Sequence, residues 1–360
     1  MLKENVQFIG LGMCGNRLGR LLESVGYDVL YFNSDLVDVR GLGVKEENLL
    51  LISGTGTGGS PIKGKEIIDV YIEEFTRFFT DKMMEGKMQI FLAGLGGGTG
   101  GSSLIPAIKI AKDLGHKVGV IATLPPKMLG MLASDNALKT LRTLKELDLN
   151  MFLIADNEYL TQEVGLSDNW WLKINEYIIT KVVSVFSLLR EGKITQSGLG
   201  SIDKAEIMRI LQHGGGQTDI REVIIKIKEL DSMDEEKLKE VLFKPCLVEG
   251  YNYKDTQAYM VSIDVPVKGV YTNFSSKVFD ITKNVSGSAI SRLGMFVDPL
   301  LTDSVRVTLI NAGLKLPKVL KSRMNNLKRD AERYKDKRSK GDSMDFDGID
   351  SLALDDDFDI

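Results

Sequence analysis

Three stretches of the chain are so rich in glycine that a ligand there would be bound mainly by backbone groups. The densest spans positions 94–101 and contains six glycines and Thr99. Glycine lets the backbone approach a ligand closely, and consecutive N–H groups at the start of a helix can hold a phosphate. A flexible linker has a similar composition. The apolar residues at 90–93 and 104–105 instead favour a buried strand that enters a helix through a phosphate-binding loop.

The other two glycine-rich loops follow the same order of elements. One is GLGMCGN at 10–16, between a strand pattern at 6–9 and a helix whose apolar residues recur at helical spacing from Leu18. The other, at 53–61, follows the apolar run 49–52. Alternating strands and helices indicate a parallel sheet, whose strand-to-helix loops all open on one edge. Three such loops can surround one polyphosphate.

The first loop by itself also fits an NAD(P)-binding oxidoreductase. The pattern GxGxxG between a strand and a helix is typical of dinucleotide sites. Asp35 follows the glycines by about 20 residues, where such enzymes place the acid that binds a ribose hydroxyl. A dinucleotide enzyme needs only one of the three loops, so this function is the alternative to a polyphosphate site.

Asp203 and Glu206 are a pair of acids that could act on a water molecule. They stand three residues apart, which puts them on one face of the start of a helix. The same spacing forms a capping box, in which each side chain binds the other residue's backbone N–H. On the residues alone, the capping role is favoured over the catalytic one.

The composition excludes several other kinds of site. The 360 residues include two cysteines, far apart in the sequence, which excludes a disulfide framework and a cysteine zinc site. With only two histidines, a His-based metal site or a Ser–His triad is not expected. A net charge of −4 gives no general attraction to nucleic acid. No apolar run reaches the length of about 18 residues that a membrane span needs, and the N-terminus lacks a signal pattern. We therefore expect a soluble cytoplasmic protein.

The elements that must position these loops divide the chain into two α/β domains. Residues 1–169 alternate strand and helix patterns, which predicts a Rossmann-like parallel sheet. Residues 170–191 are apolar on nearly every side, as expected of a buried central helix. Residues 192–314 form a smaller α/β domain, in which 218–245 look helical. The remaining expected elements are strands at 29–32, 89–93, 117–124, 151–155, 259–265, 289–296 and 305–310, and helices at 65–80, 134–147 and 273–285, with one more helix starting near Ser102 and Ser103.

The C-terminal residues split sharply by charge. Positions 315–340 hold eleven Lys/Arg against three Asp/Glu, and 341–360 hold eight Asp and neither Lys nor Arg. We expect a basic helix followed by a disordered acidic tail. The helix could bind nucleic acid, a membrane surface or an acidic protein patch, or it could simply be solvated.

Residues 96–102, GGGTGGS, resemble the GGGTG signature of the tubulin/FtsZ superfamily. The chain looks most like the TubZ branch, which moves plasmid and phage DNA. This likeness rests on the departure from the signature at Gly101 and Ser102, on the compact length and on the basic C-terminal segment. The resemblance extends from Val6 to about Lys340. It implies an α/β GTPase domain, a long central helix and a smaller activation domain. It also implies GTP or GDP with Mg²⁺ as the bound groups, with no side chain assigned to the metal.

The resemblance also implies a role for residues in each loop. Asn16 would contact the base, whereas Thr57 and its neighbours would sense the γ-phosphate. Asn157 would read guanine, with Trp171 stacked on the base and Asn175, one turn later on the same helix, hydrogen-bonded to it. The full set implied to contact the nucleotide is Gly12, Met13, Cys14, Asn16, Asn33, Asp35, Gly56, Thr57, Gly58, Gly96, Gly97, Gly98, Thr99, Gly100, Lys127, Asn157, Trp171 and Asn175.

Residues 198–206 resemble the family's catalytic loop, although Ser201 stands where FtsZ has Asn, which gives SxDxxE instead of NxDxxD. In the family, two acids polarise the water that attacks the γ-phosphate bound to the neighbouring subunit. The resemblance therefore favours a catalytic role for Asp203 and Glu206, and implies a head-to-tail filament whose GTPase activity rises on assembly. It further implies a separate DNA-binding adaptor as partner, with little or no direct nucleic-acid binding and no membrane contact.

Overall fold

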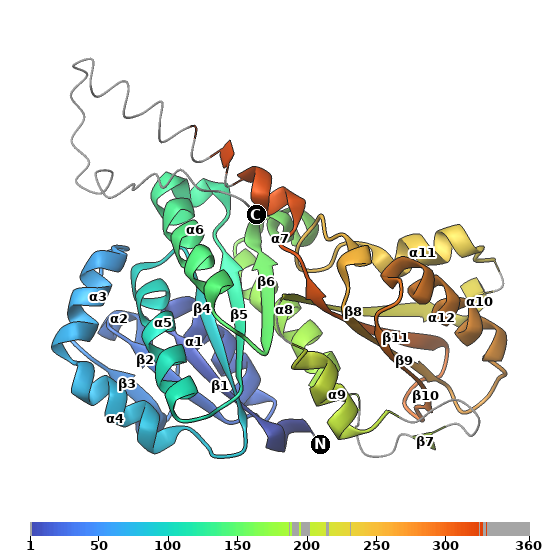
Figure 1. Ribbon diagram of the computed structural model, residues 1–360, viewed down its shortest axis with the longest axis horizontal. Coiled ribbons are helices and arrows are strands. Elements are labelled where there is room, and N and C mark those ends of the chain that lie inside the picture. The colour runs from blue at the N-terminus through green and yellow to red at the C-terminus, as the bar shows by residue number, and fades with distance from the viewer. Residues whose placement is uncertain are drawn as a thin grey trace.

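The computed structural model describes residues 2–186, 188, 194–195, 202–213, 216–230, 232–323, 325–326 and 329. The chain folds into two α/β domains that lie side by side, with the long helix α8 (Trp170–Phe186) between them (Figure 1). Each domain contains one sheet with helices packed on it. The expected fold class, a parallel-sheet domain followed by a smaller α/β domain, is confirmed.

Six parallel strands form the first sheet, in the order β3-β2-β1-β4-β5-β6. Most of their residues are buried because helices cover both faces, and this is why the sequence shows continuous apolar runs rather than alternation. The strands are β1 (Val6–Leu11), β2 (Val29–Asn33), β3 (Leu49–Leu51), β4 (Met88–Gly94), β5 (Val118–Leu124) and β6 (Met151–Asp156).

The helices of this domain pack on two separate cores. They are α1 (Gly12–Ser24), α2 (Leu36–Val39), α3 (Pro61–Val70), α4 (Ile72–Lys82), α5 (Gly98–Asp113), α6 (Gly130–Glu146) and α7 (Asn157–Val164). Phe8 and Leu92 belong to the core that contains α1 and α8. Their strand neighbours Ile9 and Phe91 belong to the opposite core, which contains α3, α4, α5 and α6.

Two helices of this domain differ from the sequence expectation. The pattern at 65–80 is two helices, α3 and α4, which meet at Tyr71. Helix α5 begins at Gly98 rather than near Ser102, so Pro106 lies inside it. Glycine starts this helix despite its low helix propensity, because a Cβ on Gly98 would lie 2.2 Å from the Thr57 hydroxyl.

Helix α8 is shorter than the expected span of 170–191. It ends at Phe186, and Leu188 lies in a turn, whereas 189–191 fall outside the described residues. Ile178 and Val182 of α8 pack in one core with Ile310 of the second domain. A continuous core therefore joins the two domains through this helix.

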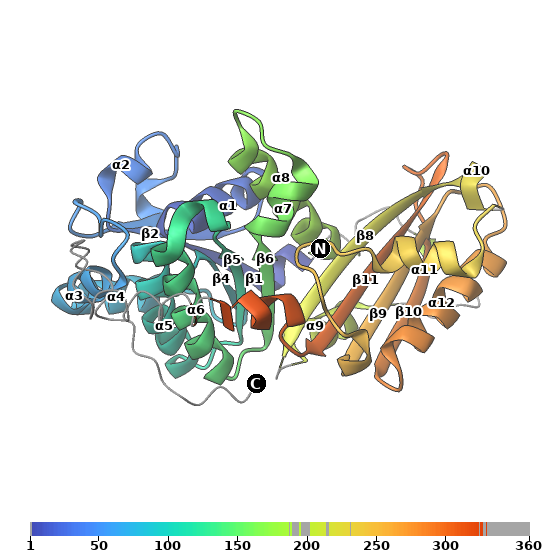
Figure 2. The same cartoon turned by 90° about the horizontal axis from the view of Figure 1, so that it is seen from above.

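The second domain is built on a five-stranded sheet in the order β7-β10-β9-β11-β8. Its strands are β7 (Ile194–Thr195), β8 (Gln217–Lys226), β9 (Ala258–Val265), β10 (Ile290–Val297) and β11 (Ser304–Leu314). Its helices are α9 (Lys204–Leu211), α10 (Ile227–Leu230), α11 (Glu235–Phe243) and α12 (Thr272–Ser286). Figure 2 shows α11 and α12 on one side of this sheet.

The helical expectation for 218–245 is wrong over its first part, where β8 is a strand of ten residues. Its β-branched residues favour a strand. Charged residues of this strand are paired within the sheet. Arg221 Nε lies 2.6 Å from Asp219 Oδ2, and Glu222 lies 3.5 Å from Arg306 of β11.

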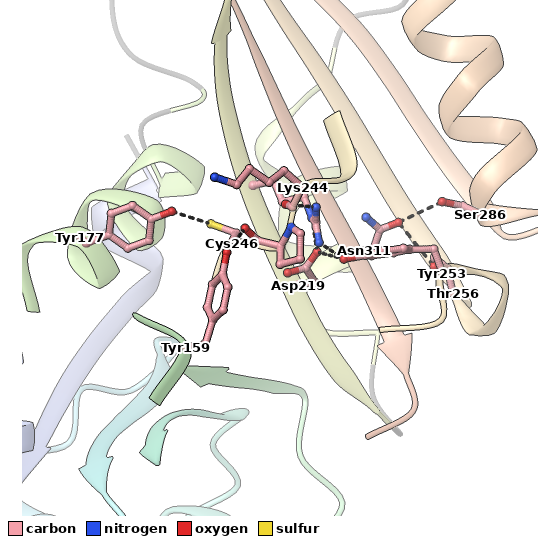
Figure 3. Close-up of polar contacts among 11 residues, drawn as sticks. Tyr159, Tyr177, Asp219, Lys244, Cys246, Tyr253, Thr256, Ser286 and Asn311 are labelled. Atoms are coloured by element: carbon pink, nitrogen blue, oxygen red, sulfur yellow. Dashed lines mark hydrogen bonds and ion pairs between the residues drawn. The ribbon is translucent and has the colours of Figure 1, made fainter. Parts of the chain in front are cut away.

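The segment 244–248, which follows α11, lies between the domains. Tyr159 of α7 donates a hydrogen bond of 2.8 Å to the Pro245 carbonyl, and the Tyr177 hydroxyl of α8 is 3.7 Å from Cys246 Sγ (Figure 3). On the other side, Arg221 of β8 donates to the Lys244 carbonyl. The segment therefore fixes α7 and α8 to the second sheet.

The basic C-terminal segment is described only at its start. Residues 318–323 are helical, as are 325, 326 and 329. The rest of the expected basic helix and the whole acidic tail lie outside the described residues. In the part of the chain that the structure describes, no helix is long and apolar enough to cross a membrane.

Candidate nucleotide site and catalytic acids

The three glycine-rich loops meet at the carboxyl edge of the parallel sheet. They follow β1, β3 and β4, whose parallel strands stand in the order β3-β2-β1-β4 and end at the same edge, and Thr55 of the second loop pairs with Asp35 after β2. Helices α1 and α5, which follow β1 and β4, pack on opposite faces of the sheet. Such a reversal opens a crevice at the carboxyl ends of the strands, which is where open α/β sheets bind ligands.

Glycine is required where the first and third loops touch. Gly12 has a φ of 67°, and a Cβ on it would lie 2.9 Å from the backbone nitrogen of Gly100. A Cβ on Gly100 would lie 2.9 Å from the Gly94 carbonyl oxygen and 3.1 Å from that of Leu11. A Cβ on Gly97, in contrast, would meet no described atom within 4 Å. The loops thus pack backbone to backbone, while Gly97 faces open space, as a phosphate cradle requires.

The second glycine loop packs against Asp35 and against the start of α5. A Cβ on Gly56 would lie 2.5 Å from the Asp35 carboxylate, and Gly98 has equally little room beside Thr57. Gly56 and Gly58 have φ values of 71° and 59°, a region that favours glycine. All three loops therefore form one continuous backbone surface.

Two helix N-termini converge on this surface. The residues that precede α1 and α5 are Leu11 and Gly97, and in the described structure neither provides a side-chain cap. The first-turn N–H groups of both helices therefore remain available to a ligand. Free N–H groups and the positive end of the helix dipole together favour an anion such as phosphate.

The hydroxyl of Thr99 lies 2.7 Å from that of Ser34, which joins the loops after β4 and β2. Asn33 and Asp35, which were expected to face the nucleotide, build this loop. The Asn33 side-chain oxygen accepts from the backbone nitrogens of Ser34 at 2.8 Å and Asp35 at 3.2 Å. Asp35 caps α2 by accepting from the Val37 nitrogen at 2.8 Å. Because this bond engages the Asp35 carboxylate, support for a ribose-binding acid of an NAD(P) enzyme is weaker.

Asn136 of α6 is a site residue that the sequence interpretation missed. Its side-chain nitrogen donates to the Gly59 carbonyl at 3.0 Å and to the Gly96 carbonyl at 3.3 Å, and the residue is buried. It thereby ties the second glycine loop to the third. The available signal was a polar residue among the buried positions of a helix, next to Ala137 and Leu138.

Buried amides without partners mark the position expected for the base. Asn16 is fully buried, and neither its side-chain nitrogen nor its oxygen has a hydrogen-bond partner within the described residues. The side-chain oxygen of Asn157, which begins α7, is in the same situation. A buried unsatisfied amide costs about 1–3 kcal/mol, so a ligand with matching donors and acceptors would be stabilised here. These residues fit the edge of a purine base.

Trp171 and Asn175 lie one turn apart at the start of α8, which packs against both α1 and α7. The rings of Trp170 and Trp171 are stacked, with centroids 3.7 Å apart. Both rings are partly exposed, and Trp170 also packs against the apolar core. Trp171 is therefore the ring that remains available to stack on a base.

Two residues of the expected set, Cys14 and Lys127, have polar contacts outside the glycine loops. The Cys14 thiol lies 3.3 Å from the Thr123 hydroxyl, and burial raises its pKa. Met13, beside it, is exposed. The Lys127 backbone nitrogen donates to Glu158 at 2.8 Å, and the Lys127 ammonium group lies 3.5 Å from the same carboxylate.

Asp203 and Glu206 form the capping box that the sequence favoured. Asp203 accepts from the Glu206 nitrogen at 2.8 Å, and Glu206 accepts from the Asp203 nitrogen at 3.1 Å. The other oxygen of Glu206 lies 2.6 Å from Arg292 Nε. Residues 198–201 of the expected catalytic loop lie outside the described residues.

The two acids lie at the amino edge of the parallel sheet, opposite the glycine loops. Helix α9 lines one cavity together with Asn5, Lys87 and Lys117, which directly precede β1, β4 and β5. Figure 1 shows α9 beside the N-terminus. A strand of seven residues such as β4 spans roughly 20 Å. The structure therefore does not bring Asp203 and Glu206 to the glycine loops of the same chain.

Comparison with known proteins agrees with the geometry of the glycine loops. Residues 5–165 match the model of the Tubulin/FtsZ family, GTPase domain. "Cell division protein FtsZ 1" of Pyrococcus furiosus is 25% identical over 325 residues, which cover 87% of this chain and 82% of that protein. "Cell division protein FtsZ 1" of Methanocaldococcus jannaschii is 26% identical over 330 residues, covering 87% and 84%.

Solved structures share the fold over nearly the whole chain. TubZ of Bacillus thuringiensis serovar israelensis, in a GTPγS-form protofilament, superposes with a TM-score of 0.80 at 16% identity and covers 94% of both chains. CetZ2 of Haloferax volcanii superposes with a TM-score of 0.75 at 19% identity, covering 92% of this chain and 99% of that one. The glycine loops, the uncapped helix N-termini and the family match together identify residues 5–165 as a GTPase domain of the Tubulin/FtsZ family.

Proposed function

We propose that the protein assembles into a head-to-tail filament in which each complete GTPase site is shared by two subunits. The observation that supports this most directly is the position of the two acids. Asp203 is the N-cap of α9 at the amino edge of the sheet, whereas Gly97 and Thr99 lie at the carboxyl edge. A contact that stacks one edge on the other brings the acids of one subunit to the nucleotide of the next. A head-to-tail contact that does not close produces a filament.

In this proposal the nucleotide lies in the crevice between α1 and α5. The N–H groups at the starts of these helices bind the phosphates, and the loop with Gly56, Thr57 and Gly58 contacts the γ-phosphate. Asn16, Asn157 and Asn175 bind the edge of guanine, and Trp171 stacks on its face. Support comes from the unpartnered side-chain atoms of Asn16 and Asn157, the burial of Asn175 and the partial exposure of Trp171.

Mg²⁺ would reach the site together with the phosphates. It usually keeps several waters and takes only one or two carboxylates beside phosphate oxygens. In line with this, the described residues contain no group of three or more His, Cys, Asp or Glu that could hold a metal by themselves. The residues beside the loops that suit it are Asp35 and the hydroxyls of Ser34 and Thr99. When bound, the ion would neutralise charge on the phosphates.

Hydrolysis requires positioning of a water and stabilisation of charge more than covalent catalysis. Asp203 and Glu206 of the neighbouring subunit would orient the water and accept its proton. Within the subunit both carboxylates hold the start of α9, and this fixes their position before the next subunit arrives. The bound nucleotide and the catalytic acids would thus come together only in the assembled filament.

The dependence of specific activity on protein concentration tests this proposal. GTP hydrolysis per subunit should be near zero below a threshold concentration and should rise steeply above it, together with light scattering. Electron microscopy above the threshold should show filaments. A specific activity that is independent of concentration would mean that one chain contains the whole site.

We further propose that the filament segregates plasmid or phage DNA through a separate DNA-binding adaptor. Support comes from the fold shared with TubZ and from the charge of 315–340 and 341–360, which offers a segment for protein contacts. Relatives named as cell division proteins offer the competing role in division. Loss of a host plasmid on deletion of the gene, with normal division, would support segregation; filamentous cells with a stable plasmid would support division. A DNA mobility shift without adaptor should show little binding.

A further inference from the structure

Arg323 connects the start of the C-terminal segment to the candidate base site. One guanidinium nitrogen donates to Asp156 Oδ1 at 3.0 Å, and the other donates to the Pro125 carbonyl oxygen. The side chains of Arg323 and Asp156 are only 11% and 6% exposed, so this is a buried ion pair between residues 167 positions apart. Figure 1 shows the C-terminal turns, in red, beside α7.

The Asp156 carboxylate that Arg323 binds also starts helix α7. The same oxygen, Oδ1, accepts from the Glu158 nitrogen at 3.0 Å and so caps the helix whose first residue is Asn157. The Asp156 backbone nitrogen is held as well, by a 2.8 Å bond to the Leu247 carbonyl. The orientation of Asn157 therefore depends on where this carboxylate sits.

Two contacts join the end of β5 to the start of α7, one on each side of Asn157. Arg323 links Asp156 to Pro125, which follows β5. Glu158 accepts from the Lys127 nitrogen at 2.8 Å. The first contact comes from the far end of the chain, whereas the second is local to the two loops.

We propose that Arg323 is a positioning residue for base recognition, which holds Asp156 and Pro125 together so that the buried side-chain oxygen of Asn157 faces the guanine edge. This inference rests on the proposed role of Asn157. A guanine presents N–H donors on the edge that an amide oxygen would bind, and inosine lacks the exocyclic amino group among them. Selectivity between GTP and ITP therefore reports the position of Asn157.

The charge environment of Asp156 gives a second readout. Burial raises the pKa of the Asp156 carboxyl. The positive charge of Arg323 lowers this pKa, and the negative charge of the nearby Glu158 carboxylate raises it. Without Arg323, the pKa of Asp156 should rise further. The variant would then protonate its helix cap at a pH where the natural protein keeps it ionised, and base recognition would recover as the pH is raised.

The experiment compares Arg323→Met with Lys318→Met, which removes an exposed positive charge from the same segment. Affinities for GTP and ITP are measured by fluorescence titration from pH 6 to 8. Arg323→Met should weaken GTP binding roughly tenfold, the change expected on loss of one oriented hydrogen bond, and should weaken ITP binding less. Its GTP affinity should rise with pH, whereas that of Lys318→Met should match the natural protein. Arg323→Lys should restore part of the preference for GTP.

The possible outcomes separate this inference from the function on which it rests. If the natural protein does not prefer GTP over ITP, the proposed role of Asn157 fails. If it does, and Arg323→Met keeps the same ratio of affinities, Arg323 has only a structural role and the inference is overturned. If Arg323→Met does not fold, Arg323→Lys alone tests the inference. A ratio of GTP affinity to ITP affinity lower than that of the natural protein supports positioning, and an unchanged ratio contradicts it.

Discussion

Glu206 and Arg292 form an ion pair, with Oε1 2.6 Å from Nε, that ties the first turn of α9 to strand β10. The second oxygen of Glu206 binds the Asp203 nitrogen, so both oxygens of this carboxylate are engaged within the subunit. The two acids therefore form a rigid unit of the second domain rather than a flexible loop. A rigid unit suits a site that is completed by docking, because no reorganisation is needed after contact.

Asp203→Asn should abolish most GTP hydrolysis without unfolding α9. Asn caps a helix about as well as Asp, so the substitution removes the carboxylate charge but keeps the cap. We expect turnover to fall by roughly a hundredfold or more, the usual contribution of a general base, and filaments to persist because GTP is not cleaved. Phosphate release and light scattering measure the two effects.

Asp234→Asn provides the matched control for this change. Asp234 caps α11 in the same way, by accepting from the Lys237 nitrogen at 2.8 Å. Its replacement should leave turnover unchanged. Normal turnover by Asp203→Asn would remove Asp203 from the catalytic assignment and leave only its capping role.

Thr99→Ala should weaken GTP binding while the chain still folds. The substitution removes the 2.7 Å contact between the Thr99 and Ser34 hydroxyls, but the glycine contacts that pack the loops remain. One hydrogen bond is worth about 0.5–1.5 kcal/mol, which corresponds to a roughly threefold to tenfold loss of affinity. Isothermal titration with GTP measures it. Thr143→Ala, which removes a hydroxyl from the exposed side of α6, should bind GTP normally, and equal losses in both variants would contradict a local role for Thr99.

Arg221→Met should destabilise the fold strongly. Arg221 and Asp219 are 3% and 1% exposed, and the Tyr253 hydroxyl donates to the same Asp219 oxygen at 3.0 Å (Figure 3). Removing one partner of a buried pair leaves an uncompensated charge and costs about 3–5 kcal/mol. Urea unfolding should show the loss as a lower midpoint. The control is Lys226→Met on the same strand, whose pair with Asp303 is exposed and should contribute little.

The two cysteines should react slowly in the native protein. Burial raises the pKa of both the Cys14 and the Cys246 thiols, so little thiolate, the reactive form, exists at pH 8. Alkylation by iodoacetamide should therefore be much slower in buffer than in urea, as followed by peptide mass spectrometry. Fast native labelling of Cys14 would show that the first turn of α1 stabilises the thiolate despite burial.

Much of the first domain could be predicted because its determinants are local. A parallel strand covered on both faces needs a continuous apolar run, and β1, β4, β5 and β6 show one. The loops that follow β1 and β4 need glycine because backbone meets backbone there, and the loop that follows β3 needs it at positions of positive φ. The same stretch of sequence thus specifies the strand, the loop and the anion-binding start of the next helix.

Tertiary partners decided the features that the sequence did not reveal. The helical expectation for 218–245 was wrong over β8, because the groups that pair with its charges, Arg306 and the Lys244 carbonyl, come from distant parts of the chain. Asn136 bridges two loops, and Arg323 reaches Asp156 before α7, through contacts that no local pattern encodes. The placement of Asp203 at the edge opposite the glycine loops likewise follows from how the second domain packs on α8.

The sequence by itself thus determined that the chain has a polyphosphate-binding α/β domain and two acids at the start of a later helix. The tertiary structure decided that these two parts face opposite ends of one sheet. The physical reason is that glycine spacing and helix caps act over a few residues, whereas the distance between two sites depends on packing across the whole core.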